Sequence, residues 1–193
     1  TSQTATVTVN EQTPPPSGNI STQGLVAYWK FDETSGTSAS DSSGNGNTGT
    51  LQGGVAWTNQ GYLGNALQFD GVDDLVTTIH TPSIDVIQQV EIEAWVRHDA
   101  LGYGTIVSRN GPYLLAIYNN KVHGGIYTNG GGCTGGPGCW TEIDGTTNLQ
   151  IGVWYKLKMK YNGNTIKVFV NDLEENSAPK NGQTPVLSQN LNI

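Results

Sequence analysis

Positive charge is scarce in this sequence: only 9 of its 193 residues are Lys or Arg, and the formal net charge is −7. A nucleic-acid-binding surface needs clustered basic side chains to neutralise phosphates, and no such cluster is present. The same shortage disfavours anionic membranes and polyanions as partners. A neutral glycan, a cation or a cell-surface protein suits this charge better.

Long apolar runs are also missing, so we expect no membrane insertion. The sequence lacks a recognisable signal peptide and begins at Thr1, which indicates a mature or excised piece of a longer protein. The three histidines, His80, His98 and His123, have no metal-ligand spacing. We therefore expect them at the surface.

Cysteine is limited to Cys133 and Cys139, which flank a Gly-rich loop. Two cysteines are too few for a structural metal site, and the redox CxxC spacing is absent. We favour a disulfide between them over two free thiols, which would place the protein outside the reducing cytosol, secreted or at the cell surface.

Turn-forming residues are abundant, with 26 glycines and many Asn, Ser and Thr residues. Between them lie short segments in which apolar and polar residues alternate, which is typical of strands. We expect strands at 24–31, 65–69, 74–79, 90–97, 105–109, 113–118, 122–127 and 154–170, the last a hairpin that turns at Asn162-Gly163. With no convincing amphipathic helix, the pattern predicts an all-β sandwich of two antiparallel sheets.

The first residues are organised differently. Residues 5–10, ATVTVN, alternate like a strand, and three consecutive prolines follow at 14–16. We interpret 1–12 as a strand of a preceding module or as a donor or edge strand, 13–23 as a Pro-rich linker and 24–193 as the sandwich domain.

Four motifs in order resemble a known family: GLVAYWKFDETSGTSASDSSGNGNTGTL, GNALQFDGVDDLV, VEIEAWVRHD and WYKLKMKYNGNTIKVFVND. Together they cover about residues 24–175 and are similar to the LamG-like (laminin G-like) jelly-roll family of the concanavalin A-like lectin/glucanase superfamily. The resemblance implies a jelly-roll sandwich that serves as an accessory module of a large exported protein. The family normally has two further closing strands, which this sequence lacks. A truncated chain, strands supplied from elsewhere and a different closure are the alternatives, and residues 5–10 are one candidate to fill the gap.

The resemblance also implies one structural Ca²⁺, for which hard oxygen ligands are needed. The candidate ligands are Asp32, Asn45, Asn47 and Asp70, with Asp73 and Asp74 as a weaker pair. The alternative is that these side chains cap turns.

Trp140 lies outside the shared motifs, directly after the Cys133–Cys139 loop. Sugar recognition combines an aromatic platform with carboxylates that accept hydrogen bonds from hydroxyl groups. The candidate ligand-binding residues are therefore Trp140, Tyr103, Tyr127, Glu142 and Asp144. A Trp that only covers the disulfide is the alternative, whereas Trp29, Trp57 and Trp154 lie in the shared motifs and are expected to be structural.

Glu91 and Glu93 resemble the start of the superfamily's glucanase motif E-x-D-x-x-E, but the following residues Trp95, Val96 and Arg97 supply no third carboxylate. We interpret the pair as part of a solvent-facing polar row. The sequence thus predicts a non-catalytic extracellular module that binds carbohydrate or serves adhesion. The alternatives are a structural subunit of a surface fibre, pilus or cell-surface layer assembled by strand addition between neighbouring subunits, and a degenerate glucanase-like domain.

Overall fold

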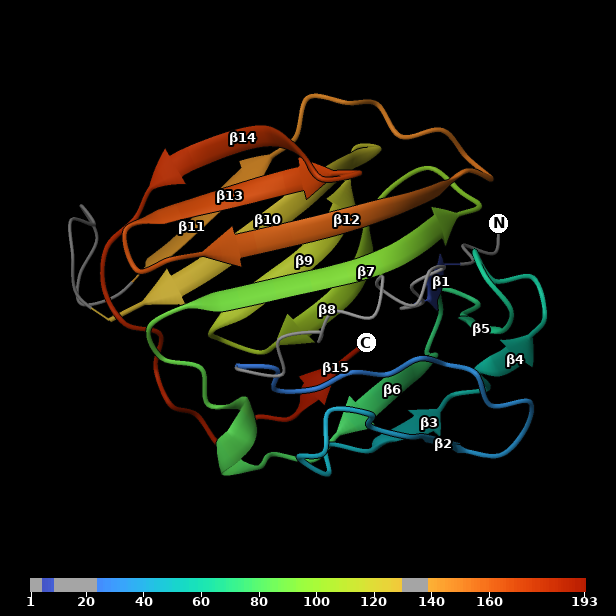
Figure 1. The fold of residues 1–193 in the computed structure, drawn as a ribbon. Coiled ribbons are helices and arrows are strands. Elements are labelled where there is room, and N and C mark those ends of the chain that lie inside the picture. Colours follow the sequence, from blue (N-terminus) through green and yellow to red (C-terminus); the bar gives the residue numbers. More distant parts are fainter. Residues whose placement is uncertain (1–4, 9–23, 130–138) are drawn as a thin grey trace, which may run out of the picture.

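The computed structural model describes residues 5–8, 24–129 and 139–193, and its described regular structure is almost entirely β-strand (Figure 1). One sheet has five strands in the order β1 (Ala5–Thr8), β7 (Val90–His98), β12 (Trp154–Tyr161), β13 (Thr165–Val170) and β14 (Leu173–Pro179). The other has eight, in the order β11 (Cys139–Asp144), β10 (Lys121–Thr128), β9 (Tyr113–Tyr118), β8 (Gly104–Arg109), β15 (Leu191–Asn192), β6 (Leu75–Thr78), β3 (Gly49–Gln52) and β2 (Ser38–Ala39).

A separate hairpin joins β4 (Ala56–Thr58) to β5 (Ala66–Gln68), and a 3₁₀ turn covers Pro82–Ile84. The ladders between these strands are antiparallel, and the two large sheets face each other (Figure 1). The predicted all-β sandwich is therefore confirmed. Among the described residues no helix is long and apolar enough to cross a membrane.

The core lies between the two large sheets. Every second side chain along a strand points into it, as the alternation in the sequence predicts. From the five-stranded sheet it takes the buried side chains of Ala94, Val96, Leu157, Met159, Ile166 and Val168. From the eight-stranded sheet it takes those of Leu115, Ile117, Val122 and Ile126. Burial of this apolar surface is the main favourable term in folding.

Gly124 on β10 sets how closely the sheets approach. A Cβ atom at this position would lie 2.6 Å from Cγ1 of Val168 and 2.8 Å from Cγ of Met159, both on the opposite sheet. Any other residue type would force these side chains to shift, which explains a glycine inside a strand.

The expected strand at 24–31 is the main departure from the prediction. Trp29 and Phe31 are buried, but this segment forms only an isolated bridge between Trp29 and Asp41. Phe31 has φ 55°, in the left-handed region, so the backbone turns away where a strand would continue. The alternation of apolar and polar residues at 24–31 therefore reflects the burial of side chains such as Trp29 and Phe31, and not continuous pairing with a neighbouring strand.

β1 pairs antiparallel with β7, from Ala5 opposite His98 to Thr8 opposite Trp95, and so forms an edge of the five-stranded sheet. The linker predicted at 13–23 lies outside the described residues. The division of the chain at residues 12 and 23 stays a prediction.

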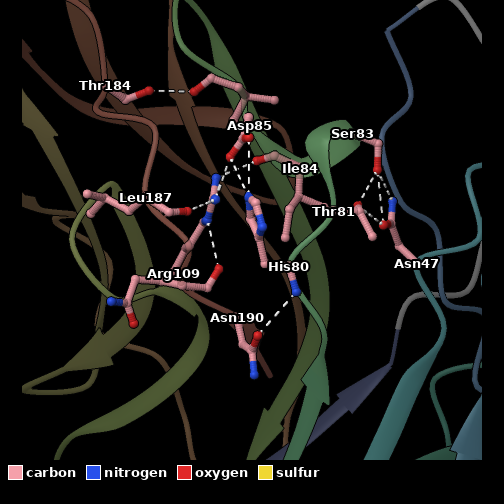
Figure 2. Close-up of polar contacts among 12 residues, drawn as sticks. Asn47, His80, Thr81, Ser83, Ile84, Asp85, Arg109, Thr184, Leu187 and Asn190 are labelled. Carbon is pink, nitrogen blue, oxygen red and sulfur yellow. Dashed lines mark hydrogen bonds and ion pairs between the residues drawn. The ribbon is translucent and has the colours of Figure 1, made fainter.

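Arg109 holds the segment before β15 against the rest of the sandwich, a role that no sequence pattern indicates. Its guanidinium is fully buried and donates hydrogen bonds to the carbonyls of Ile84, Leu187 and Gln189 (Figure 2). It also pairs with Asp85 at 2.5 Å between Nη2 and Oδ1. A buried cation needs this many partners to offset the loss of its hydration.

Candidate functional site

The five predicted ligand-binding residues lie on the outer face of the eight-stranded sheet, on or next to β8, β10 and β11. On β11 the period-two alternation turns Ile143 into the core and turns Trp140, Glu142 and Asp144 outward, where all three are exposed. Because the sheet is antiparallel, outward residues of neighbouring strands stand side by side. We call this surface the aromatic face and define it by Tyr103, Tyr118, His123, Tyr127, Trp140, Glu142 and Asp144.

The strand register places the predicted residues together. Tyr127 on β10 lies opposite Trp140 on β11, and their rings make an edge-to-face contact with centroids 6.2 Å apart. Trp140 remains 40% exposed. A large aromatic side chain that is open to water near the start of a strand, and fixed on one side by a second ring, can serve as a contact surface for a ligand.

Gly125 explains how Trp140 is oriented. It faces Glu142 in the register, and a Cβ atom on Gly125 would lie 2.9 Å from the Trp140 ring. The indole therefore lies across the bare backbone of β10. The two consecutive glycines act on the two faces of β10. Gly124 allows the opposite sheet to pack closely, and Gly125 leaves room for the indole of Trp140.

His123 completes the site beside the carboxylates. Its Nδ1 lies 2.7 Å from Oδ1 of Asp144, and its Nε2 lies 3.9 Å from Oε1 of Glu142. The expectation that the histidines are surface residues was wrong for His123 and His98, which are only 9% and 5% exposed. The position of His123 two residues before Gly125 on an alternating strand was the signal that could have placed it on the same face as Tyr127.

Tyr118 and Tyr103 extend the row of rings toward β8. The Tyr118 ring lies 5.7 Å from the His123 ring and 6.3 Å from the Tyr103 ring, centroid to centroid. Tyr103 and Tyr118 are half-exposed, and the Tyr103 hydroxyl accepts a hydrogen bond from the hydroxyl of Thr105. The aromatic face therefore crosses four neighbouring strands and could contact an extended ligand at several points.

The predicted calcium ligands are engaged in other contacts. The Asn45 amide donates to the carbonyls of Leu25 and Val26. The Asn47 amide donates to Val26, while its Oδ1 accepts from the hydroxyls of Thr81 and Ser83 (Figure 2). These contacts join residues 19 to 36 positions apart, and both amides present their nitrogen to the carbonyls.

The remaining two predicted ligands, Asp32 and Asp70, contribute differently. The backbone carbonyl of Asp32 accepts from the Asn65 amide, and Asp70 caps its own turn by accepting from the backbone N–H of Val72. The carboxylates of Asp70, Asp73 and Asp74 come together, with ligand atoms within 4.8 Å of one another. Calcium stays a prediction.

Glu91 and Glu93 lie on the outer face of the five-stranded sheet. Their contacts are with lysines and do not resemble those of a glycosidase carboxylate pair. Lys158 lies 2.8 Å from Glu93 and 3.6 Å from Glu91, and Lys160 lies 2.9 Å from Glu91. Burial alone would raise the pKa of Glu91, but the hydrogen bonds and charges of these lysines hold that pKa below its ordinary value. A general acid needs a raised pKa, so the shift runs in the wrong direction for that role.

The predicted disulfide involves Cys133, which lies outside the described residues, so it stays a prediction. The three tryptophans of the shared motifs do have structural contacts. Trp29 is buried and donates from Nε1 to the Asn47 carbonyl, and Trp57 donates to the Gly36 carbonyl. Trp154 packs under the guanidinium of Arg97 on the five-stranded sheet, 5.5 Å from the ring centroid.

Comparison with solved structures finds a similar fold in domains of other proteins. Domain 4 of AbnA, a GH43 extracellular arabinanase from Geobacillus stearothermophilus solved with arabinotriose, has a TM-score of 0.62 at 18% identity, over 87% of this chain and 82% of that chain. The binding domain of Paraclostridial Mosquitocidal Protein 1 has a TM-score of 0.60 at 11% identity, over 82% of this chain and 45% of that chain.

A third similar structure is the binding domain of botulinum neurotoxin DC in complex with rat synaptotagmin II, with a TM-score of 0.58 at 14% identity, over 86% of this chain and 45% of that chain. This chain spans less than half the length of the two toxin structures. No protein-family model and no curated protein matches the sequence. At these identities the likeness concerns the fold alone.

Proposed function

We propose that this chain is a non-catalytic carbohydrate-binding module and that its glycan lies along the aromatic face. The observation that carries the proposal is the half-exposed Trp140 ring, fixed by Tyr127 and Gly125 beside the carboxylates of Glu142 and Asp144. Sugar rings present apolar C–H faces that stack on aromatic rings, and their hydroxyl groups donate to carboxylates. The row of rings across four strands suits several sugar units.

The charge of the aromatic face selects the class of glycan. Glu142 and Asp144 are exposed acidic groups, and the chain carries a net charge of −7. Uronic acid or sulfated polymers would be repelled at this position, so we assign neutral glycans. The arabinotriose complex of the AbnA domain supports a role of this sandwich in glycan binding, and the synaptotagmin complex of the toxin domain supports a cell-surface protein as the alternative partner.

We also propose that the chain is a LamG-like module of an exported protein, on the strength of the four ordered motifs over about residues 24–175. The secreted arabinanase among the similar structures supports this location. The disulfide between Cys133 and Cys139 would then pin the loop next to Trp140.

Affinity gel electrophoresis of the purified chain in arabinan, xylan and β-glucan tests the proposal. Trp140→Ala should reduce retardation by at least about tenfold in affinity, as expected for loss of a central aromatic contact. Tyr62→Ala is the matched control, because Tyr62 is equally exposed, at 40%, but stacks on Trp95 of the opposite sheet. Equal loss in both variants, or no retardation of the parent on any neutral polymer, would refute the glycan site.

A further inference from the structure

The rings of the aromatic face are spread along the strands as well as across them. Tyr127 on β10 lies opposite Trp140. Tyr118 on β9 lies opposite Lys121, which comes six residues before Tyr127 on β10. At about 3.3 Å per residue, Tyr118 and Tyr127 are separated by about 20 Å along the strand direction. The aromatic face is therefore much longer than one sugar ring.

The ring contacts of this face form two groups. Trp140 and Tyr127 make the first, which we call the Trp140 group, with ring centroids 6.2 Å apart. Tyr103, Tyr118 and His123 make the second, the Tyr118 group, with successive centroids 6.3 Å and 5.7 Å apart. Trp140, Tyr118 and Tyr103 are exposed. Each group therefore has at least one ring on which a sugar unit can stack.

The two groups are joined by a polar stretch. Asp144 lies opposite His123 and Glu142 lies opposite Gly125, so both carboxylates stand between the Trp140 ring and the Tyr118 ring. In the part of the chain that the structure describes, the side-chain contacts of these carboxylates are with His123, through Oδ1 of Asp144 and Oε1 of Glu142. The second oxygen of each carboxylate can therefore accept a hydrogen bond from a sugar hydroxyl.

A single sugar unit can use only part of this arrangement. A unit that stacks on Trp140 can reach Glu142, but Tyr118 lies too far along the strands for the same unit to contact it. Contact with both groups requires several linked units, whose middle hydroxyls lie over the carboxylates. Linked units also gain affinity because each one after the first binds at a high effective concentration. The spacing of the rings therefore favours a chain over an isolated sugar.

We propose that the aromatic face selects an extended stretch of the main chain of a linear, neutral glycan, which runs obliquely from Trp140 on β11 to Tyr118 on β9. A trisaccharide is the shortest ligand that fills the site, with one unit on each ring group and one over Glu142 and Asp144. Single terminal sugars and short side branches contact one group and bind weakly. This inference rests on the glycan-binding function proposed above and adds the length and shape of the ligand.

The test is a length series measured by isothermal titration. The probes are oligosaccharides of two to six units prepared from the polymer, among arabinan, xylan and β-glucan, that retards the parent protein most. Affinity should rise by about tenfold or more from the dimer to the tetramer and then level off, because further units extend beyond the second ring group.

The variant that separates the two ring groups is Tyr118→Ala. It should lower the affinity for the hexamer by about tenfold and leave that for the dimer within about twofold, because the dimer binds at the Trp140 group. Trp140→Ala should lower the affinity for both oligomers. Tyr118→Phe, which restores the ring, should recover the affinity for the hexamer. Tyr62→Ala is again the matched control, since Tyr62 is exposed to a similar extent but lies on the other sheet.

Equal affinity of the parent for the dimer and the hexamer would overturn this inference and would leave the glycan site itself in place. Equal losses for both oligomers in Tyr118→Ala would do the same, since they would indicate a general disturbance of the face. Failure of every neutral polymer to retard the parent would overturn the proposed function and this inference with it. Loss of hexamer affinity in Tyr118→Ala with recovery in Tyr118→Phe would support the extended ligand.

Discussion

The two outer faces of the sandwich are built on the same alternation but satisfy their side chains differently. On the five-stranded sheet, outward residues of β7 and β12 are oppositely charged neighbours: Glu91, Glu93, Lys156, Lys158 and Lys160 pair with one another or with Asp172. On the eight-stranded sheet the outward residues of β9 to β11 include the rings of Tyr118, Tyr127 and Trp140, and the largest of them, Trp140, is 40% exposed.

This difference indicates which face is free to bind. Burial alone would lower the pKa of Lys158, but its hydrogen bond to Glu93 and the charges of Glu93 and Glu91 raise that pKa above its ordinary value. A partner that displaced such a network would have to replace these contacts. The aromatic face offers apolar area to a ligand, and no comparable ion-pair network has to be displaced there. An exposed aromatic cluster is therefore the better indication of a binding surface.

The largest expected effect on glycan binding at the aromatic face is that of Gly125→Val. The new side chain would occupy the place where the Trp140 ring lies across β10, since even a Cβ would be 2.9 Å from that ring. We expect glycan affinity to fall by about 2 kcal/mol or more, as for a central aromatic contact. Isothermal titration with the best neutral polymer measures it, and unaltered affinity would mean that the orientation of Trp140 is irrelevant.

The neighbouring change Gly124→Ala acts on the opposite side of the same strand. Its Cβ would press on Val168 and Met159, so we expect a loss of about 2 kcal/mol in the free energy of unfolding, as for overpacking in a core. Glycan affinity should be kept. Urea denaturation followed by titration separates the two effects, and a stable variant with lost binding would reverse our assignment of the two glycines.

A smaller effect is expected from Lys158→Met on the charged face. Removal of the lysine from its two glutamates should cost on the order of 1 kcal/mol, and the loss should shrink in high salt, because ion pairs near the surface are weak and screened. Glycan binding should not change. A large loss of glycan affinity in this variant would mean that the glycan binds to the charged face and not to the aromatic face.

The smallest effect concerns acid stability. Burial alone would raise the pKa of Glu175, but four hydrogen bonds from Thr146 and Thr147 lower it to about 2. Because the folded pKa lies below the ordinary value, this contribution is complete above about pH 4.5 and is lost as the pH falls toward 2. Discounted for solvent screening, it amounts to on the order of 1 kcal/mol. Glu175→Gln should flatten the dependence of unfolding on pH in that window, measured by denaturation at several acidic pH values.

Much of the fold could be predicted from alternation alone, because strands such as β7, β12 and β13 have one buried face. The hairpin β12–β13 and strands β7 to β10 lie where the pattern put them. The pattern failed at 24–31, where Trp29 and Phe31 are buried without a ladder, since burial leaves the same signal whether or not a neighbouring strand is present.

The candidate site was predicted in part. Composition on either side of the Gly-rich loop pointed to Trp140, Tyr127, Glu142 and Asp144, and the register of β10 and β11 brings them together. His123 was missed because one histidine carries no spacing signal, and its role emerges only from its position opposite Asp144. Arg109 was missed for a similar reason, since its partners are backbone carbonyls of residues up to 80 positions away. Every residue has a carbonyl group, so no residue pattern marks these partners.

The central place of β15 has a consequence for the order of folding. The strands β8 to β11 and the strands β6, β3 and β2 are joined in one sheet through Leu191 and Asn192, which pair with residues about a hundred positions earlier. Contacts of such long range form slowly, so during synthesis both half-sheets carry an open inner edge until residues 191–193 have left the ribosome. Early release or proteolytic trimming at that point should therefore produce aggregates before it produces a weakened monomer.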